Sequence, residues 1–194
     1  MTDRPPTQLA VTRQATAGVA ARLQTADLEA TPFALIHPAA AFATKQWATE
    51  KFARVVEHLA RRGVPVVAII APADKQIADE LQRSSASPLI VFADLTLPEV
   101  TALAARARLF VGNDSGIAHM AAAVGAPSVV IFGSSNVTHW RPWAKAAAEV
   151  VIEEMECQPC HGYFCEKFAQ PECIRRVPVE RVTAAIDRVL NGTQ

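Results

Sequence analysis

A Gly-Asn-Asp-Ser-Gly turn at residues 112–116, followed by an alanine-rich run, has the residue types that hold an anion. Gly116 lets the backbone approach a ligand, because glycine has no Cβ in the way. The first-turn N–H groups and the dipole of the helix that follows favour a negative charge at the same point. His119 comes four residues after Ser115, so both side chains project from one face near the helix start. The turn therefore predicts an anion-binding site.

The same turn also has a purely structural explanation. Either Asp114 or Ser115 can cap the helix, because a short side-chain oxygen accepts a backbone N–H that lacks a partner in the first turn. Apolar residues at helical spacing are expected to form its core face: Ile117, Met120, Ala121 and Val124. Gly125 is expected to end the helix. The position of the turn at the ligand-binding edge of the predicted sheet favours an anion site over capping alone.

Lys45 lies on the loop after the first predicted strand, at the sheet edge that the anion site also occupies. A lone lysine on a loop is usually solvated, but an ammonium group at this place would neutralise a phosphate. His37 is expected to be structural, because it ends the same strand beside Pro38, which breaks it.

Four other loop residues are candidates for ligand contacts, and three of them also have a structural explanation. Asp74 and Asp94 could accept hydrogen bonds from ribose hydroxyls, although helix capping explains Asp74. Trp140 and Trp143 could stack on a base or a sugar, although packing under a long loop explains them equally well. The sequence contains no nucleophile elbow, HExxH, Walker A loop or GxGxxG, so nucleotide hydrolysis and nicotinamide chemistry have no support.

Short apolar runs that alternate with amphipathic helical segments must position these residues. The expected strands cover residues 33–36, 64–70, 89–92, 109–111, 127–132 and 149–152, and the expected helices include 14–28, 48–62, 96–107 and 178–192. This alternation predicts an α/β fold with a parallel sheet covered on both faces. Right-handed crossovers then give a doubly wound, Rossmann-like sheet, in which the loops after the strands share one ligand-binding edge.

The composition fits one folded domain that is neither a general nucleic-acid binder nor a membrane-spanning protein. The chain has 194 residues, 51% of them hydrophobic, with 19 basic and 19 acidic side chains. A net charge of zero disfavours a general nucleic-acid binder. Apolar runs are too short for a membrane span, and the first ten residues lack a signal peptide, so the cytoplasm is the expected location. Residues 1–30 are expected to be a flexible lead-in and linker helix, and residues 31–194 the domain.

Four cysteines fall within a loop at residues 157–173, before the last helix: Cys157, Cys160, Cys165 and Cys173. In a chain without an export signal, this grouping favours a metal site or free thiols over a disulfide framework. The spacing of the first pair suits zinc, but the later spacings are irregular. A structural zinc site and four free thiols both remain open.

Three segments together resemble glycosyltransferase family 9, which contains the ADP-heptose:lipopolysaccharide heptosyltransferases. They are residues 37–47, which include His37, Pro38 and Lys45, residues 113–127, and the Ile-Phe-Gly of residues 131–133. The cysteine-rich segment before the final helix is also similar to many members. The order and spacing of the segments make the match specific, and it covers about residues 30–190.

The resemblance implies one half of a GT-B glycosyltransferase, which has two Rossmann-like halves, and this chain matches the carboxyl-terminal, donor-binding half. Lys45 would contact the diphosphate of ADP-heptose, Ser115 and Gly116 would donate to it, Asp114 would hold sugar hydroxyls, and His119 would lie beside the phosphates. The implied reaction is an inverting transfer to a lipopolysaccharide-core acceptor, without a required cofactor. The general base is expected in the amino half, so no catalytic residue is assigned here.

The chain departs from the family pattern at two places. Alanines occupy residues 39–41, where the family usually has glycine and serine, and Ser134 and Ser135 stand where it often has Pro-Thr. Two alternatives to a transferase stay open. One is a non-catalytic sugar-nucleotide-binding module or a truncated fragment, with a separate amino-terminal half as partner. The other is an interaction domain stabilised by a metal on the cysteine loop. As a transferase, the protein would be cytoplasmic, at the periphery of the inner membrane.

Overall fold

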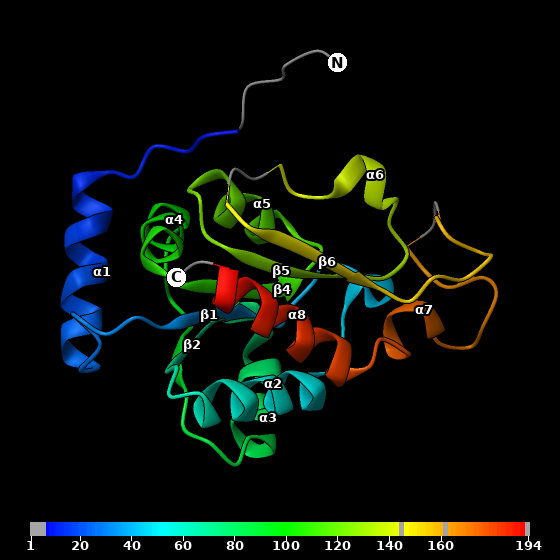
Figure 1. Cartoon of the computed structure of the whole chain (residues 1–194), viewed down its shortest axis with the longest axis horizontal. Helices are drawn as coiled ribbons and strands as arrows, with labels where there is room; N and C mark the ends of the chain where they lie inside the picture. The colour runs from blue at the N-terminus through cyan, green and yellow to red at the C-terminus, as the bar shows by residue number, and fades with distance from the viewer. Residues whose placement is uncertain (1–6, 144–145, 161–162, 193–194) are drawn as a thin grey trace.

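The computed structural model describes residues 7–143, 146–160 and 163–192, and within them it contains a six-stranded parallel sheet. The strands are β1 (Ala34–His37), β2 (Val66–Ile69), β3 (Ile90–Phe92), β4 (Leu109–Asn113), β5 (Ser128–Phe132) and β6 (Ala148–Ile152). Their order in the sheet is β3-β2-β1-β4-β5-β6. Successive strands are added outwards from β1 on one side and outwards from β4 on the other, so the chain changes its direction of travel across the sheet between β1 and β4 (Figure 1). This order confirms the predicted doubly wound, Rossmann-like sheet.

Helices cover both faces of the sheet. Residues of α2 (Thr49–Arg61), α3 (Lys75–Ser84) and α8 (Val179–Gly192) belong to the core on one face. Residues of α1 (Arg13–Thr25), α4 (Leu97–Arg106) and α5 (Gly116–Ala123) belong to the core on the other. The shorter helices η1 (Ala43–Lys45), η2 (Pro72–Asp74), α6 (Val137–Trp140) and α7 (Glu172–Arg175) lie in connections.

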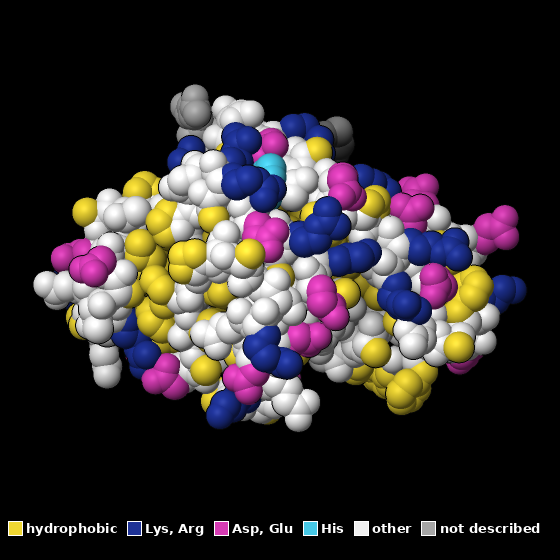
Figure 2. Space-filling model, turned by 90° about the horizontal axis from the view of Figure 1, so that it is seen from below, with side chains coloured by type: hydrophobic (Ala, Val, Ile, Leu, Met, Phe, Trp, Pro, Cys, Tyr) yellow, Lys and Arg dark blue, Asp and Glu magenta, His cyan; other side chains and the backbone are white. Residues whose placement is uncertain are grey.

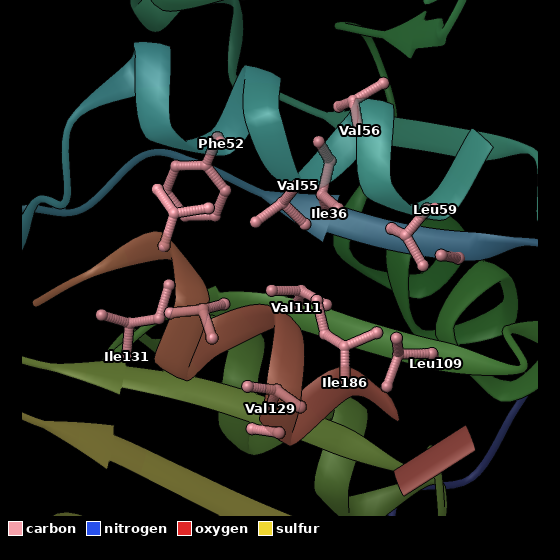
Figure 3. Close-up of a cluster of buried hydrophobic side chains, with 14 of the residues drawn as sticks. Ile36, Phe52, Val55, Val56, Leu59, Leu109, Val111, Val129, Ile131 and Ile186 are labelled. Carbon is pink, nitrogen blue, oxygen red and sulfur yellow. The ribbon is translucent and has the colours of Figure 1, made fainter. Parts of the chain in front are cut away.

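The core on the α2 face follows directly from the sequence pattern. Phe52, Val55 and Leu59 recur at helical spacing on α2 and are fully buried. Figure 3 shows them packed with Ile186 of α8 and Val111 of β4. This packing holds α2 against the sheet, because α2 cannot shift without opening the core. The loop between β1 and α2 is therefore held at the end where it joins α2.

The core on the opposite face contains α1, whose buried residues pack against α4. The Thr12 hydroxyl caps α1 by accepting from Ala15 N at 3.2 Å. A capping box starts α4, since Thr96 N donates to the Glu99 carboxylate at 2.8 Å. Whether residues 1–30 behave as a separate unit stays a prediction, and residues 1–6 lie outside the described part of the chain.

Two expectations about helices are wrong in detail. Asp74 stands at the N-cap of α3, but its side chain makes no capping hydrogen bond. On α5, Ala121 is buried as expected, whereas Ile117, Met120 and Val124 are only half-buried. The reason is that α5 turns its alanines to the core, and the larger side chains flank that contact.

Basic and acidic side chains lie side by side on the face seen in Figure 2, which agrees with the zero net charge. None of the helices in the described ranges has the length and apolarity needed to cross a membrane.

Candidate functional site

The reversal of strand order between β1 and β4 creates the crevice in which ligands of such sheets bind. The chain leaves β1 towards α2 on one face and leaves β4 towards α5 on the other. His37 at the end of β1 is paired in register with Gly112 of β4, so the two exit loops begin side by side. Lys45 and Asp114 are carried by these two loops, as the sequence predicted.

Asn113 ties the β1 exit loop to the end of β4. Its side-chain oxygen accepts from Trp47 N at 3.1 Å, and its side-chain nitrogen donates to Pro38 O at 2.8 Å. Asn113 is fully buried, so both bonds are shielded from water. Trp47, also fully buried, donates from Nε1 to Val177 O at 3.0 Å. The loop that carries Lys45 is therefore fixed at both ends.

Gly133, directly after β5, packs against the loop that carries Lys45. A Cβ at this position would lie 2.1 Å from Thr44 O, so only glycine fits. The next residue, Ser134, donates from its backbone N to Thr44 O at 3.1 Å. Thr44 immediately precedes Lys45, and this contact therefore sets the position of the lysine.

Lys45 and Asp114 form an ion pair between the β1 exit loop and the turn that follows β4. Lys45 Nζ lies 2.8 Å from Asp114 Oδ2, and the side chains are 24% and 4% exposed. Asp114 Oδ2 has no aligned hydrogen bond among the described residues, so the pair is a contact of opposite charges. The expectation that Asp114 caps α5 is wrong, because its carboxylate is turned to Lys45 instead.

The start of α5 is open, as an anion site requires. Ser115 stands at the N-cap in an extended conformation, but its hydroxyl makes no capping bond, so this part of the capping expectation is also wrong. The N–H groups of Gly116 and Ile117 have no partner inside the helix. A Cβ built on Gly116 meets nothing within 4 Å, so the space above the helix end is free.

His37 lies at the site, although the sequence indicated only a structural role. Its Nδ1 lies 3.4 Å from Ser115 Oγ. The Ser115 hydroxyl therefore contacts His37 and does not cap the start of α5. Burial lowers the pKa of His37 to about 4, so the ring is neutral at pH 7. The register of β1 against β4 was the signal that could have revealed this contact.

Acidification is expected to destabilise the chain through His37. The pKa is about 4 in the folded chain and about 6.5 in the unfolded one, so the unfolded chain binds the proton first. Stability is therefore present above pH 6.5 and is lost as the pH falls towards 4, by about 2 kcal/mol between pH 7.5 and 5. Urea unfolding at both pH values measures this loss. The His37→Gln variant should show a smaller loss, and an equal loss in both proteins would contradict the assignment.

Some of the remaining candidate residues lie near the ion pair of Lys45 and Asp114, and others lie elsewhere in the structure. His119 is half-buried one turn into α5, with its backbone N 3.4 Å from Ser115 O. The Asp94 carboxylate accepts hydrogen bonds from Arg22 Nη1 and Nη2, both at 2.8 Å, so its oxygens are paired with that guanidinium. Trp140 lines a cavity that Lys45 also lines, whereas Trp143 lines a different one.

The cysteine loop packs against the same region. Cys160 N donates to Ser134 O at 2.9 Å, and all four cysteines are free thiols. Burial, more than the neighbouring thiols, raises the pKa of Cys160 and of Cys173. Among the residues that the structure describes, no three His, Cys, Asp or Glu side chains are arranged to hold a metal ion. Residues 161–162 of this loop lie outside the described ranges. A structural zinc site therefore gains no support from the described cysteines.

Comparison with known families gives a match over most of the chain. A family model described as "Glycosyltransferase family 9 (heptosyltransferase)" matches residues 3–168. Lipopolysaccharide heptosyltransferase 3 of Escherichia coli K12 is 32% identical over 162 residues, which are 81% of this chain and 46% of that protein. The chain thus spans about half the length of the curated relatives it matches.

Solved structures with the same fold include two from this group. A glycosyl transferase family 9 structure from Veillonella parvula superposes with a TM-score of 0.82 at 21% identity, over 95% of this chain and 54% of that one. The ADP-heptose LPS heptosyltransferase II of E. coli superposes with a TM-score of 0.78 at 20% identity, over 96% and 54%. At these identities the superpositions show the fold.

Proposed function

Since this chain belongs to glycosyltransferase family 9, we propose that it is the donor-binding half of a heptosyltransferase-like enzyme. In this proposal it binds ADP-heptose or a related sugar nucleotide for inverting transfer to a lipopolysaccharide-core acceptor. Relatives are named as lipopolysaccharide heptosyltransferases, and one neighbouring structure is named for ADP-heptose. The proposal also expects an amino-terminal half as partner and a cytoplasmic location at the periphery of the inner membrane.

One observation carries the proposal: a lysine ammonium and an uncapped helix start lie together at the crevice between β1 and β4. Lys45 supplies a full positive charge, and the free N–H groups of Gly116 and Ile117 supply fixed donors. Asp114 links the two elements and is the group proposed to hold sugar hydroxyls. His119 lies one turn further along α5 and is proposed to stand beside the phosphates.

These groups suit the departure of a nucleoside diphosphate. In the transfer, an acceptor hydroxyl forms a bond to the anomeric carbon while the bond from that carbon to the phosphate oxygen breaks. The electron pair stays on the diphosphate, so negative charge grows there in the transition state. Fixed donors aimed at the growing charge lower the barrier, and Lys45 with the start of α5 would do so without a metal cofactor. The acceptor proton goes to a general base, which we expect in the amino half.

Gly116→Val tests the proposed phosphate site. The added side chain enters open space, so we expect the free energy of unfolding to fall by less than about 1 kcal/mol. The same side chain would stand where the phosphate approaches the helix, so we expect ADP to bind at least about tenfold more weakly.

Titration calorimetry of the chain with ADP measures this effect. Gly192→Val is the matched control, because Gly192 also faces open space but lies at the end of α8. Full ADP affinity in Gly116→Val, or no ADP binding by the unmodified chain, would refute the proposed donor site. ADP binding without transfer, even when an amino half is supplied, would instead favour a non-catalytic binding module.

A further inference from the structure

The side chains of His37 and Ser115 meet where two loops of the proposed donor site begin. His37 is the last residue of β1, and Ser115 stands at the N-cap of α5, directly after the turn that follows β4. Nδ1 of the ring lies 3.4 Å from Oγ of the serine. Within the described ranges, each side chain has the other as its only hydrogen-bonding partner. The contact therefore determines where the other polar hydrogens and lone pairs of the two groups point.

The backbone around His37 keeps the ring in this position. His37 is paired in register with Gly112 of β4, and a Cβ built on Gly112 would lie 3.1 Å from His37 O. Glycine thus lets the two strand ends approach closely. The next carbonyl, that of Pro38, accepts from the buried side chain of Asn113 at 2.8 Å. The chain is therefore fixed on both sides of the ring, and a ring held in this way can orient a hydroxyl.

The contact between His37 and Ser115 has room for one hydrogen only. The ring is neutral at pH 7, because burial lowers the pKa of His37 to about 4. A neutral imidazole carries one N–H, and a serine hydroxyl carries one O–H and two lone pairs. Either Ser115 donates to Nδ1, or the ring carries its hydrogen on Nδ1 and donates to Ser115. The two arrangements leave different groups of Ser115 free for a ligand.

An anion beside Ser115 would distinguish the two arrangements. If Ser115 donates to the ring, only lone pairs of Oγ face outwards, and they repel a phosphate oxygen. If the ring donates, the Ser115 O–H is free to donate to that oxygen, and a hydrogen bond to a charged partner is stronger than a neutral one. Gly116 is next in the chain, and the space beside it is open. The Ser115 hydroxyl would thus join the free N–H groups at the start of α5.

We infer that His37 is a positioning residue of the donor site: it donates from Nδ1 to Ser115 Oγ and thereby turns the Ser115 O–H towards the diphosphate. The inference rests on the proposed function, because it takes the diphosphate as the anion. In this arrangement His37 does not touch the ligand. Its effect on binding therefore passes through Ser115, and a mutant cycle can test that dependence.

The cycle consists of His37→Leu, Ser115→Ala and the double variant, with ADP affinity measured by calorimetry and folding checked by thermal melts. We expect ADP to bind about tenfold more weakly to Ser115→Ala and about threefold or more weakly to His37→Leu. In the Ser115→Ala background, His37→Leu should change the affinity by less than about twofold, because the hydroxyl that it would orient is gone. His37→Asn should stay within about twofold of the unmodified chain, because its amide nitrogen can donate in place of Nδ1.

The tautomer of His37 provides a second readout, in the unmodified chain. Long-range proton–nitrogen NMR of the chain with isotope-labelled histidine shows which ring nitrogen carries the hydrogen. The signal that is missing from His37→Asn identifies His37. With ADP bound at neutral pH, we expect the hydrogen on Nδ1. A hydrogen on Nε2 instead would overturn the inference, even if His37→Leu does not fold.

The outcomes separate this inference from the proposed function. An equal loss of ADP affinity from His37→Leu in both backgrounds would mean that His37 only supports the β1 exit, and it would overturn the inference alone. Repeating the cycle with inorganic pyrophosphate tests the phosphate contact without the nucleoside. If the unmodified chain binds pyrophosphate but not ADP, the proposed nucleotide is wrong, and the pyrophosphate cycle still decides the role of His37. If it binds neither, the proposed function and the inference both fail.

Discussion

Gly133→Ala is expected to destabilise the chain by about 3 kcal/mol and to remove ADP binding at the same time. The new Cβ would lie 2.1 Å from Thr44 O and 3.0 Å from the Cβ of Ile174. The first neighbour is backbone, so it cannot move aside as a flexible side chain would. The β1 exit loop must shift instead, and Lys45 moves with it.

Urea unfolding measures the stability of Gly133→Ala, and thermal melting should show a midpoint about 6–12 °C lower. Gly116→Ala is the control, since it makes the same change at the same edge of the sheet but in open space. We expect the control to lose less than about 1 kcal/mol. A Gly133→Ala protein with full stability and ADP affinity would mean that the contact with Thr44 does not position the lysine.

Much of this fold could be predicted because the pattern that sets it is local. Apolar strands of three to five residues alternate with amphipathic helices, and parallel pairing with right-handed crossovers leaves few topologies. The loops after β1 and β4 then had to meet at one edge, which is why Lys45 and Asp114 were expected together. Their 2.8 Å contact has this origin.

The details that could not be predicted depend on contacts between distant segments. The close approach of Gly133 to Thr44 exists only when the β5 exit and the β1 exit loop are both in place. The capping of α5 was misjudged for a similar reason. Asp114 and Ser115 have the right residue types for a cap, but Lys45 and His37, each more than 60 residues away, compete for their oxygens.

The packing of α5 shows how two valid patterns compete. Its larger apolar residues have helical spacing, which predicted a core face, but its alanines have the same period. Small side chains let a helix lie close to the sheet, so the alanine face is the one that is buried. The cysteine loop presents a different problem: its spacing carries no signal that it would close a cavity beside Lys45.

Lys45→Met is expected to lower the free energy of unfolding by about 2–4 kcal/mol, because it leaves the Asp114 carboxylate buried without its cation. Methionine keeps most of the side-chain volume, so packing changes little. Asp114→Asn alone should cost less, since the Lys45 side chain is 24% exposed and its ammonium can turn to water. The double variant should recover most of the stability that Lys45→Met loses, and the mutant cycle isolates the coupling of the pair.

The ADP affinities of the same four proteins should rank differently from their free energies of unfolding. Lys45→Met and the double variant should both lose about 1–3 kcal/mol of ADP binding free energy, because each lacks the ammonium that meets the diphosphate. Asp114→Asn keeps that ammonium and should bind ADP at least as well as the unmodified chain. Urea unfolding ranks the four proteins by stability, and calorimetry ranks them by ADP affinity. If the double variant regained ADP affinity along with its stability, Lys45 would act only as the structural partner of Asp114, and the donor would have to lie elsewhere.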